Sequence, residues 1–592
     1  MAWLILGCLA VYLVAYFSYG RLLARLFALD PAARTPAHER ADGEDFVPTS
    51  RFYLLSQHFS AISAAGPIAG PILAALAFGW WPALLWIVFG NVFIGALHDM
   101  SALVGSVKHR ACSVAEIVRQ YLNPRTYAVF TFYIWLALVY VIIAFTDITA
   151  RAFVENLDVA LPSASGDALP GASGDALVAG AEGGVSAVIS GARLQVAGAG
   201  VASSSMLYLA LALAMGVFVK FAKAPLWLTT LIFVPLVGAA IWFGPSLPLD
   251  WRAGAANPSL YWAWGILAYC GVASMLPMWL LLQPRGYLGG FFLYVTLGGG
   301  LLGLLIANPS IEWAGFKGFT SASGQPLVPF LFITIACGAC SGFHGLVCSG
   351  TTSKQLDREP DSRLVGYGGM LLEGVVALIA LACVMQLAQG SEISSQGPDK
   401  IFGYGVGTFL AKLGLPLAFC VSFGMLAFAT FVYDTLDVCT RLARYLFQEF
   451  TGWRGRTAGV VGTVVSLALP FWVVAQTVAD AKGNPIPAYR VIWPLFGSSN
   501  QLLAALTLLG LVLWLVRTNK PRVLQVMVAL PMLFMLAMTL SALFLQVRDP
   551  KATPALVGVG WVLLVLAAWV AIEGFVALAR GNTSARAPET GA

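Results

Sequence analysis

A histidine stands among small and hydroxylated residues in the segment ACGACSGFHGLVCSGTTSK, most of which lies in an apolar run at 327–352 that is long enough to cross a bilayer. An ionisable residue at membrane depth is costly and marks a relay or a binding site, and histidine titrates near neutral pH. His344 is therefore a candidate carrier of a coupling proton; a neutral histidine held by one neighbouring carbonyl is the alternative. The hydroxyls also suit sodium, so both coupling ions stay open. The candidates here are Ser341, His344, Ser349, Thr351 and Thr352.

The apolar run at 52–78 contains proline and glycine where a continuous helix needs backbone hydrogen bonds. In QHFSAISAAGPIAGPILAAL, Pro67 and Pro71 lack the amide proton. Gly66 and Gly70 permit close approach or unusual dihedral angles. A backbone break inside hydrocarbon is tolerated only where protein or a water-filled cavity satisfies the freed groups. We therefore expect an unwound stretch at 63–70 beside a cavity.

A second interruption is expected in the run at 260–282, where YCGVASMLPMWLLLQPRGYL carries Gly271, Ser274 and Pro277. It lies five spans later with the opposite direction, the spacing that an inverted five-helix repeat would produce, with both broken helices facing each other near the midplane. The helix start in the first break would offer amide donors to a carboxylate. Simple kinking or close packing of the helices is the alternative. The expected substrate-binding residues are Ser63, Gly66, Pro67, Gly70, Pro71, Ser274 and Pro277.

Other ionisable residues fall in or near the apolar runs. Asp437 and Arg441 are four residues apart and predict a structural ion pair on one helix face. His58 is a second candidate proton carrier. His98–Asp99 is either a proton-coupling pair or an anchor near the membrane surface. The remaining ionisable residues of this kind are Asp147, Glu373 and Asp434.

The composition requires a membrane setting for these residues. Of 592 residues, 59% are hydrophobic and 10% are charged, which excludes a soluble globular enzyme. The net charge of +6 is small, and no Lys/Arg run supports nucleic-acid binding. The nine cysteines fall almost entirely in apolar segments, so we expect packing and no disulfide framework. We find no Walker A, H-E-x-x-H or G-x-S-x-G pattern, and expect neither an enzyme nor a cofactor or metal.

Apolar runs predict an all-α polytopic membrane protein with about 15 transmembrane helices. Most of the 34 Lys and Arg residues fall in one set of alternate loops, which favours the N-terminus outside and the C-terminus in the cytoplasm. Residues 151–203 repeat the letters ASGDAL and predict a flexible external loop. The expected spans are 3–20, 52–78, 81–106, 126–146, 204–219, 226–243, 260–282, 286–307, 327–352, 364–388, 415–438, 457–479, 493–516, 523–546 and 555–579.

Six blocks of sequence resemble the carbon starvation protein A family of bacterial inner-membrane transporters, and the likeness covers most of the chain. The blocks are QHFSAISAAGPIAGPILA, GALHDMSAL, YCGVASMLPMWLLLQPRGYL, SGFHGLVCSGTTSKQL, TLDVCTRLARYLFQE and WPLFGSSNQLLAAL.

The resemblance implies the fold of the amino acid–polyamine–organocation superfamily, a five-plus-five inverted repeat with two broken helices. It places an N-terminal helix and loop at 1–51, the transport core at 52–440 and additional helices at 441–592. Two features depart from the family pattern: Gln57–His58 stands where two histidines are usual, and Asp434 stands where threonine is usual.

Together, the residues and the resemblance predict a secondary active transporter in the bacterial inner membrane. It would import a small organic anion, with pyruvate favoured, by proton symport and alternating access. A peptide uptake carrier and sodium-coupled symport are the alternatives. The expected partners are the substrate, the coupling ion and the lipid bilayer, and no nucleic acid.

Overall fold

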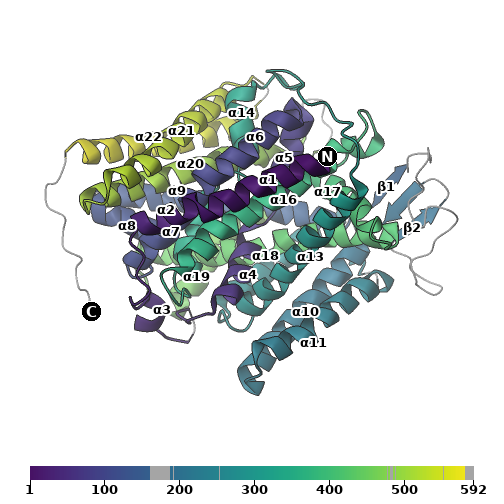
Figure 1. Cartoon of the computed structure of the whole chain (residues 1–592), viewed down its shortest axis with the longest axis horizontal. Helices are drawn as coiled ribbons and strands as arrows, with labels where there is room; N and C mark the ends of the chain where they lie inside the picture. The colour runs from purple at the N-terminus through teal and green to yellow at the C-terminus, as the bar shows by residue number, and fades with distance from the viewer. Residues whose placement is uncertain are drawn as a thin grey trace.

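Long helices form most of the chain and lie side by side in one bundle (Figure 1). The structure is a computed structural model that describes residues 1–592 except 44, 161–186, 191–192, 248, 252–253, 477, 480–484, 487, 551 and 581–592. The α-helices are α1 (Ala2–Phe17), α2 (Tyr19–Leu26), α3 (Pro36–Glu39), α4 (Arg51–Ile62), α5 (Gly66–Phe78), α6 (Trp80–Gly90), α7 (Ala96–Lys108), α8 (Val114–Tyr121), α9 (Pro124–Ala152), α10 (Gly198–Ala222), α11 (Leu226–Phe243), α12 (Pro258–Met275), α13 (Leu282–Ala307), α14 (Leu327–Thr334), α15 (Gly342–Val347), α16 (Gly369–Met385), α17 (Pro398–Ala411), α18 (Leu417–Thr451), α19 (Arg456–Val474), α20 (Ala488–Arg517), α21 (Arg522–Val547) and α22 (Pro554–Ala579).

The shorter elements connect or interrupt these helices. The π turns are η1 (Asn91–Gly95), η3 (Cys348–Thr352) and η4 (Arg363–Gly368), and the 3₁₀ turns are η2 (Gly244–Ser246) and η5 (Glu392–Ser395). The strands are β1 (Leu157–Ala160), β2 (Ala187–Ser190), β3 (Arg193–Val196), β4 (Val478–Ala479) and β5 (Pro485–Ile486).

The helices confirm a polytopic helical membrane protein. In the described part of the chain, 12 helices are long and apolar enough to cross a bilayer, or up to 13 if the bent pair α4–α5 is one span. This is fewer than the expected count of about 15. The runs at 260–282 and 327–352 are not among them. Helix α12, with 18 residues, is long enough but not apolar enough, and the second run is divided into α14, α15 and η3.

The first expected break is present but shorter than expected: of the stretch 63–70, only 63–65 lie outside a helix. Helix α4 ends at Ile62, α5 begins at Gly66, and the two are bent by 44°. Pro67 lies in the first turn of α5, where its missing amide proton costs no helical hydrogen bond. Pro71 lies inside α5.

The break that faces the first one lies between α14 and α15, and not at Pro277 as the sequence predicted. A Cβ atom on Gly66 would lie 2.3 Å from Cys337 Sγ, and one on Gly70 would lie 2.7 Å from the carbonyl oxygen of Thr334. The two glycines therefore let α5 touch the second break directly. Near Pro277 the chain instead passes from the end of α12 to the start of α13.

Side chains from other helices satisfy the backbone of this second break, as a break inside hydrocarbon requires. Trp86 Nε1 donates to the carbonyl of Ile335 at 3.3 Å, and Asn91 Nδ2 donates to that of Gly338 at 3.4 Å. The amide of Phe343 donates to Asn500 Oδ1 at 2.9 Å. Tertiary hydrogen bonds thus stabilise the break inside the protein.

Only the ends of the expected loop at 151–203 are described. Strand β3 pairs with β1 and β2 in an antiparallel sheet of three strands, seen at the side of the bundle in Figure 1. The duplicated ASGDAL segments at 164–169 and 172–177 lie outside the described residues.

Candidate transport site

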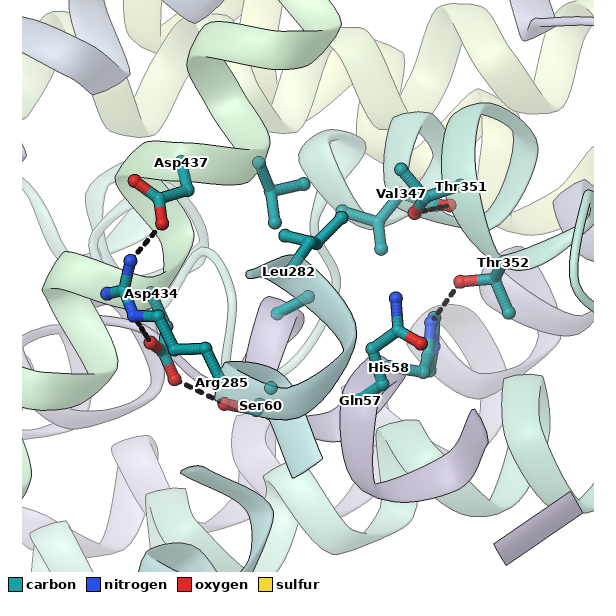
Figure 2. A pocket seen from close by; sticks show the side chains of 13 residues that line it. Gln57, His58, Ser60, Leu282, Arg285, Val347, Thr351, Thr352, Asp434 and Asp437 are labelled. Carbon is teal, nitrogen blue, oxygen red and sulfur yellow. Dashed lines mark hydrogen bonds and ion pairs between the residues drawn. The ribbon is translucent and has the colours of Figure 1, made fainter. Parts of the chain in front are cut away.

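A narrow cavity lies between α4, α13, α18 and the continuous pair α15–η3 (Figure 2). The centre of a water molecule can reach only about 20 Å³ of its space. A bound solute of more than a few atoms would therefore have to move these walls. The lining residues are Gln57, His58, Ser60, Ala61, Leu282, Arg285, Gly286, Val347, Thr351, Thr352, Asp434, Asp437 and Val438.

Arg285 of α13 is the cation of this cavity lining, and its side chain is 2% exposed. Its Nε atom lies 2.5 Å from Asp434 Oδ1, and its Nη1 atom pairs with Asp437 Oδ2. Figure 2 shows the guanidinium between the two carboxylates of α18. The Nε and Nη2 atoms are buried, and neither makes a hydrogen bond among the described residues. One cation thus faces two carboxylates, and two of its nitrogen atoms are free to donate a hydrogen bond.

Neighbouring helices hold the two aspartates differently. Ser60 of α4 donates to Asp434 Oδ2 at 2.7 Å, which connects α18 to the helix that precedes the first break. Tyr269 of α12 donates to Asp437 Oδ2 at 2.7 Å and accepts from Arg285 Nη1 at 2.7 Å. Asp437 therefore has two strong donors on one oxygen, while Asp434 Oδ1 depends on Arg285 alone.

The other side of the cavity carries His58 and the hydroxyls of η3. His58 Nδ1 lies 2.9 Å from Thr352 Oγ1. Thr351 Oγ1 donates to the carbonyl of Val347 at 3.0 Å. These three predicted residues line the cavity.

A second group of ionisable side chains lies outside the cavity lining. His344 Nδ1 is 2.9 Å from Asp99 Oδ2, and His344 Nε2 is 3.4 Å from Glu373 Oε2. His98 Nδ1 lies 2.8 Å from the other oxygen of Asp99. All four side chains are fully buried. This chain of alternating imidazoles and carboxylates can hold and pass a proton; we call it the His344 cluster.

The helices that bear the His344 cluster share a local feature. A π turn, in which the backbone hydrogen bond spans five residues, lies directly before α7, directly after α15 and directly before α16. These turns are η1, η3 and η4, respectively.

The other predicted site residues serve packing contacts in this structure. Ser349 Oγ donates to the carbonyl of Gly345, and Ser341 Oγ exchanges hydrogen bonds with Asn500. Ser274 Oγ donates to the carbonyl of Gly271 and lies 3.1 Å from Thr463 Oγ1 of α19. None of the seven expected substrate-binding residues is among those that line the cavity between α4, α13 and α18. They are Ser63, Gly66, Pro67, Gly70, Pro71, Ser274 and Pro277.

The predicted ion pair between Asp437 and Arg441 is wrong. Asp437 forms an ion pair with Arg285, which belongs to helix α13. Arg441 Nη2 donates to the carbonyls of Ala273 at 3.1 Å and Leu276 at 2.5 Å, at the end of α12. The guanidinium therefore caps a helix end, where free carbonyls favour a cation.

Arg285 is the main residue that the sequence reasoning missed. The expected spans ended at 282 and began again at 286, so Arg285 was read as part of a short loop. The structure places it in the first turn of α13, facing α18. An arginine within reach of an apolar run could have been marked as a candidate, since charged residues in such runs are paired.

The bundle defines a polytopic helical membrane protein with a buried, charged cavity. The chain belongs to the family described as "Carbon starvation protein CstA", whose family model matches residues 1–394 and 387–542.

Three relatives match almost the whole chain. The pyruvate/proton symporter BtsT of Escherichia coli (strain K12) is 28% identical, with 92% of this chain and 81% of the relative covered. The peptide transporter CstA of Helicobacter pylori (strain J99 / ATCC 700824) is 29% identical, with 93% and 82% covered. The peptide transporter CstA of Bacillus subtilis (strain 168) is 28% identical, with 97% and 95% covered. These relatives are transporters, which indicates that the chain is not an enzyme.

Among solved structures, a manganese transporter of Eremococcus coleocola aligns with a TM-score of 0.49 and 13% identity, covering 91% of this chain and 99% of that one.

Proposed function

We propose that this protein imports a small monocarboxylate, with pyruvate as the substrate, by proton symport across the bacterial inner membrane. Arg285 carries this proposal, because a buried guanidinium with a free donor is the group that best binds a planar carboxylate. The narrow cavity favours a solute of few atoms. The pyruvate/proton symporter of Escherichia coli, at 28% identity, supports the same assignment.

The coupling proton belongs to the His344 cluster in this proposal. His344 lies between two carboxylates, so its imidazole can hold a proton where an isolated charge would be too costly. A Cβ atom on Gly369 would lie 3.1 Å from His58 Cδ2, and Gly369 is one helical turn from Glu373 on α16. His58 therefore stands between the cavity and the His344 cluster.

Alternating access would act on the core at 52–440 through the contact between the two breaks. Gly66, Gly70 and the segment 334–338 form that contact, and serve as its pivot in this proposal. In this proposal Arg285 binds the substrate carboxylate, in place of the helix amides that the sequence suggested.

A peptide carrier is the second candidate. Asp434 and Asp437 could accept the ammonium group of a peptide while Arg285 binds its carboxylate. Relatives named peptide transporters cover the chain to the same extent as the pyruvate symporter.

Uptake of labelled pyruvate into proteoliposomes tests the proposed function. We expect accumulation under an inward proton gradient, none under a sodium gradient alone, and weak competition by unlabelled di- and tripeptides. Peptide uptake without pyruvate uptake would overturn the substrate, and accumulation driven by sodium alone would overturn the coupling ion.

Arg285→Gln should weaken pyruvate binding by about 100-fold, the scale of losing one partner of a buried charged pair. Because this change leaves two buried carboxylates without a cation, the neutral variant Arg285→Gln/Asp434→Asn/Asp437→Asn is measured beside it for folding. Arg548→Gln, at an exposed arginine stacked on Phe544, is the matched control and should bind as the unaltered protein does.

A further inference from the structure

Asp434 already lies against one of the two Arg285 nitrogen atoms that a substrate carboxylate would bind. A guanidinium offers a carboxylate two parallel donors along one edge. Nε and Nη2 of Arg285 share such an edge. Asp434 Oδ1 forms an ion pair with Nε at 2.5 Å, and neither nitrogen makes a hydrogen bond among the described residues. Nη1 points elsewhere, to Asp437 and Tyr269. Moving Asp434 aside would free the whole edge for a two-point contact.

Asp434 is the aspartate that can be displaced. Among the described residues its Oδ1 atom forms an ion pair with Arg285 and no hydrogen bond, whereas Asp437 Oδ2 also accepts from Tyr269. Ser60 would keep donating to Asp434 Oδ2 after Oδ1 is released. The side chain therefore retains one hydrogen bond in a position away from the guanidinium.

The charge of the site decides the protonation state in which Asp434 moves away from Arg285. One guanidinium already faces two carboxylates, and a substrate anion would add a third negative charge among almost fully buried side chains. A proton on Asp434 Oδ1 would keep the total charge unchanged. The groups that face Asp434 are Arg285 of α13, Ser60 of α4, Tyr208 of α10 and Asp437 and Tyr433 of α18. Arg285 is the cation among them.

Resting on the proposed function, we propose that Asp434 occupies the substrate's place on Arg285 and leaves it as a neutral acid, so that each carboxylate binds together with one proton. The step breaks the ion pair between Asp434 Oδ1 and Arg285 Nε, forms an O–H bond on Asp434 from a solvent proton, and forms two N–H···O bonds from Arg285 to the substrate. The protein thereby selects solutes with a carboxylate. Binding of the substrate is thereby linked to one proton at the cavity itself, in addition to the proton that the proposed function places on the His344 cluster.

Calorimetric titration of the purified full chain with pyruvate tests this inference. Titrations in buffers of different ionisation enthalpy give the number of protons taken up. The unaltered protein should take up about one proton per pyruvate. Its affinity for pyruvate should fall about tenfold for each unit of rise in pH, in the range where Asp434 is ionised in the free protein. Asp434→Asn should bind pyruvate with no such uptake and with an affinity that does not depend on pH.

Further variants separate the outcomes. His344→Gln should still take up the proton on binding; loss of the proton there instead of in Asp434→Asn would overturn the inference. Unchanged proton uptake in Asp434→Asn, or loss of its binding with an unchanged melting temperature, would also overturn it. If Asp434→Asn does not fold, Asp434→Thr, which keeps an acceptor for Ser60, takes its place with the same expectations. Absence of pyruvate binding to the unaltered protein would overturn the proposed function and this inference with it.

Discussion

Two groups of buried ionisable side chains have different tasks in the proposed function. The cavity group centres on Arg285 and would bind the substrate, whereas the residues of the His344 cluster are not among those that line the cavity. Both oxygens of Glu373 are buried without a hydrogen bond, so the ion pair with His344 is its principal interaction in the described residues. A proton on His344 is therefore stabilised mainly by Glu373 and Asp99.

Replacing Glu373 with glutamine should separate coupling from substrate binding. Without that carboxylate, His344 loses one of the two charges that stabilise its protonated form. We expect proton-driven pyruvate uptake to fall by about 100-fold, as for other lost proton-transfer groups, while exchange of external for internal pyruvate continues. Glu39→Gln, on the exposed surface of α3, is the control. Equal loss of uptake and exchange would contradict this role.

At the level of elements, close approach of α13 to α4 and α18 builds the cavity. A Cβ atom on Gly289 of α13 would lie 2.4 Å from Asp434 Oδ2 and 2.5 Å from Ser60 Oγ. The absent side chain therefore lets Arg285 reach its partners. Gly298 lies on the same helix with no atom within 4 Å of the corresponding position.

Gly289→Ala should force α13 away from the aspartates and lower stability by about 1–3 kcal/mol, the usual cost of overpacking. Pyruvate binding should weaken with it. Gly298→Ala, which adds the same methyl group in open space, should leave both unchanged or raise the melting temperature slightly. Thermal unfolding in detergent and calorimetric binding measure the two effects. Equal behaviour of the two variants would show that the close approach is not needed.

The sequence predicts one break well and the other poorly for a physical reason. Pro67 and Pro71 lack amide protons, so the local sequence is enough to predict the first break. The second break, at 335–341, holds no proline, and its carbonyls are satisfied by Trp86 and Asn91 from distant parts of the chain. Arg285 was missed likewise, because its partner Asp437 lies 152 positions away. Periodicity and composition therefore predict the helical membrane class, while tertiary contacts decide the site.

Over the whole molecule, the first residue lies near the loop after α13. The amino group of Met1 donates to Asn308 Oδ1 at 3.3 Å, so the two lie on one side of the bundle. Phe27 stacks on Trp514, with ring centres 6.2 Å apart, at the other end of the paired helices α1 and α2. With the N-terminus proposed outside, the loop at Asn308 is outside and the end of α20 is in the cytoplasm.

Cysteine labelling in intact cells tests this orientation. Ser310→Cys, exposed in the loop after α13, should react with a membrane-impermeant maleimide, whereas Thr518→Cys, exposed after α20, should react only after the membrane is opened. The unaltered chain, whose cysteines are buried or half-buried, gives the background. Labelling of Thr518→Cys alone in intact cells would reverse the proposed orientation.

The π turns beside the His344 cluster have a geometric consequence. Each turn adds a residue to a helix that would otherwise wind regularly, and one residue of an α-helix corresponds to a rotation of about 100°. Regular winding through η1 would swing His98 and Asp99 away from His344, and regular winding through η4 would do the same to Glu373. The His344 cluster therefore forms only when these helices keep their π turns. Loss of one π turn would separate its side chains without moving the helix axes.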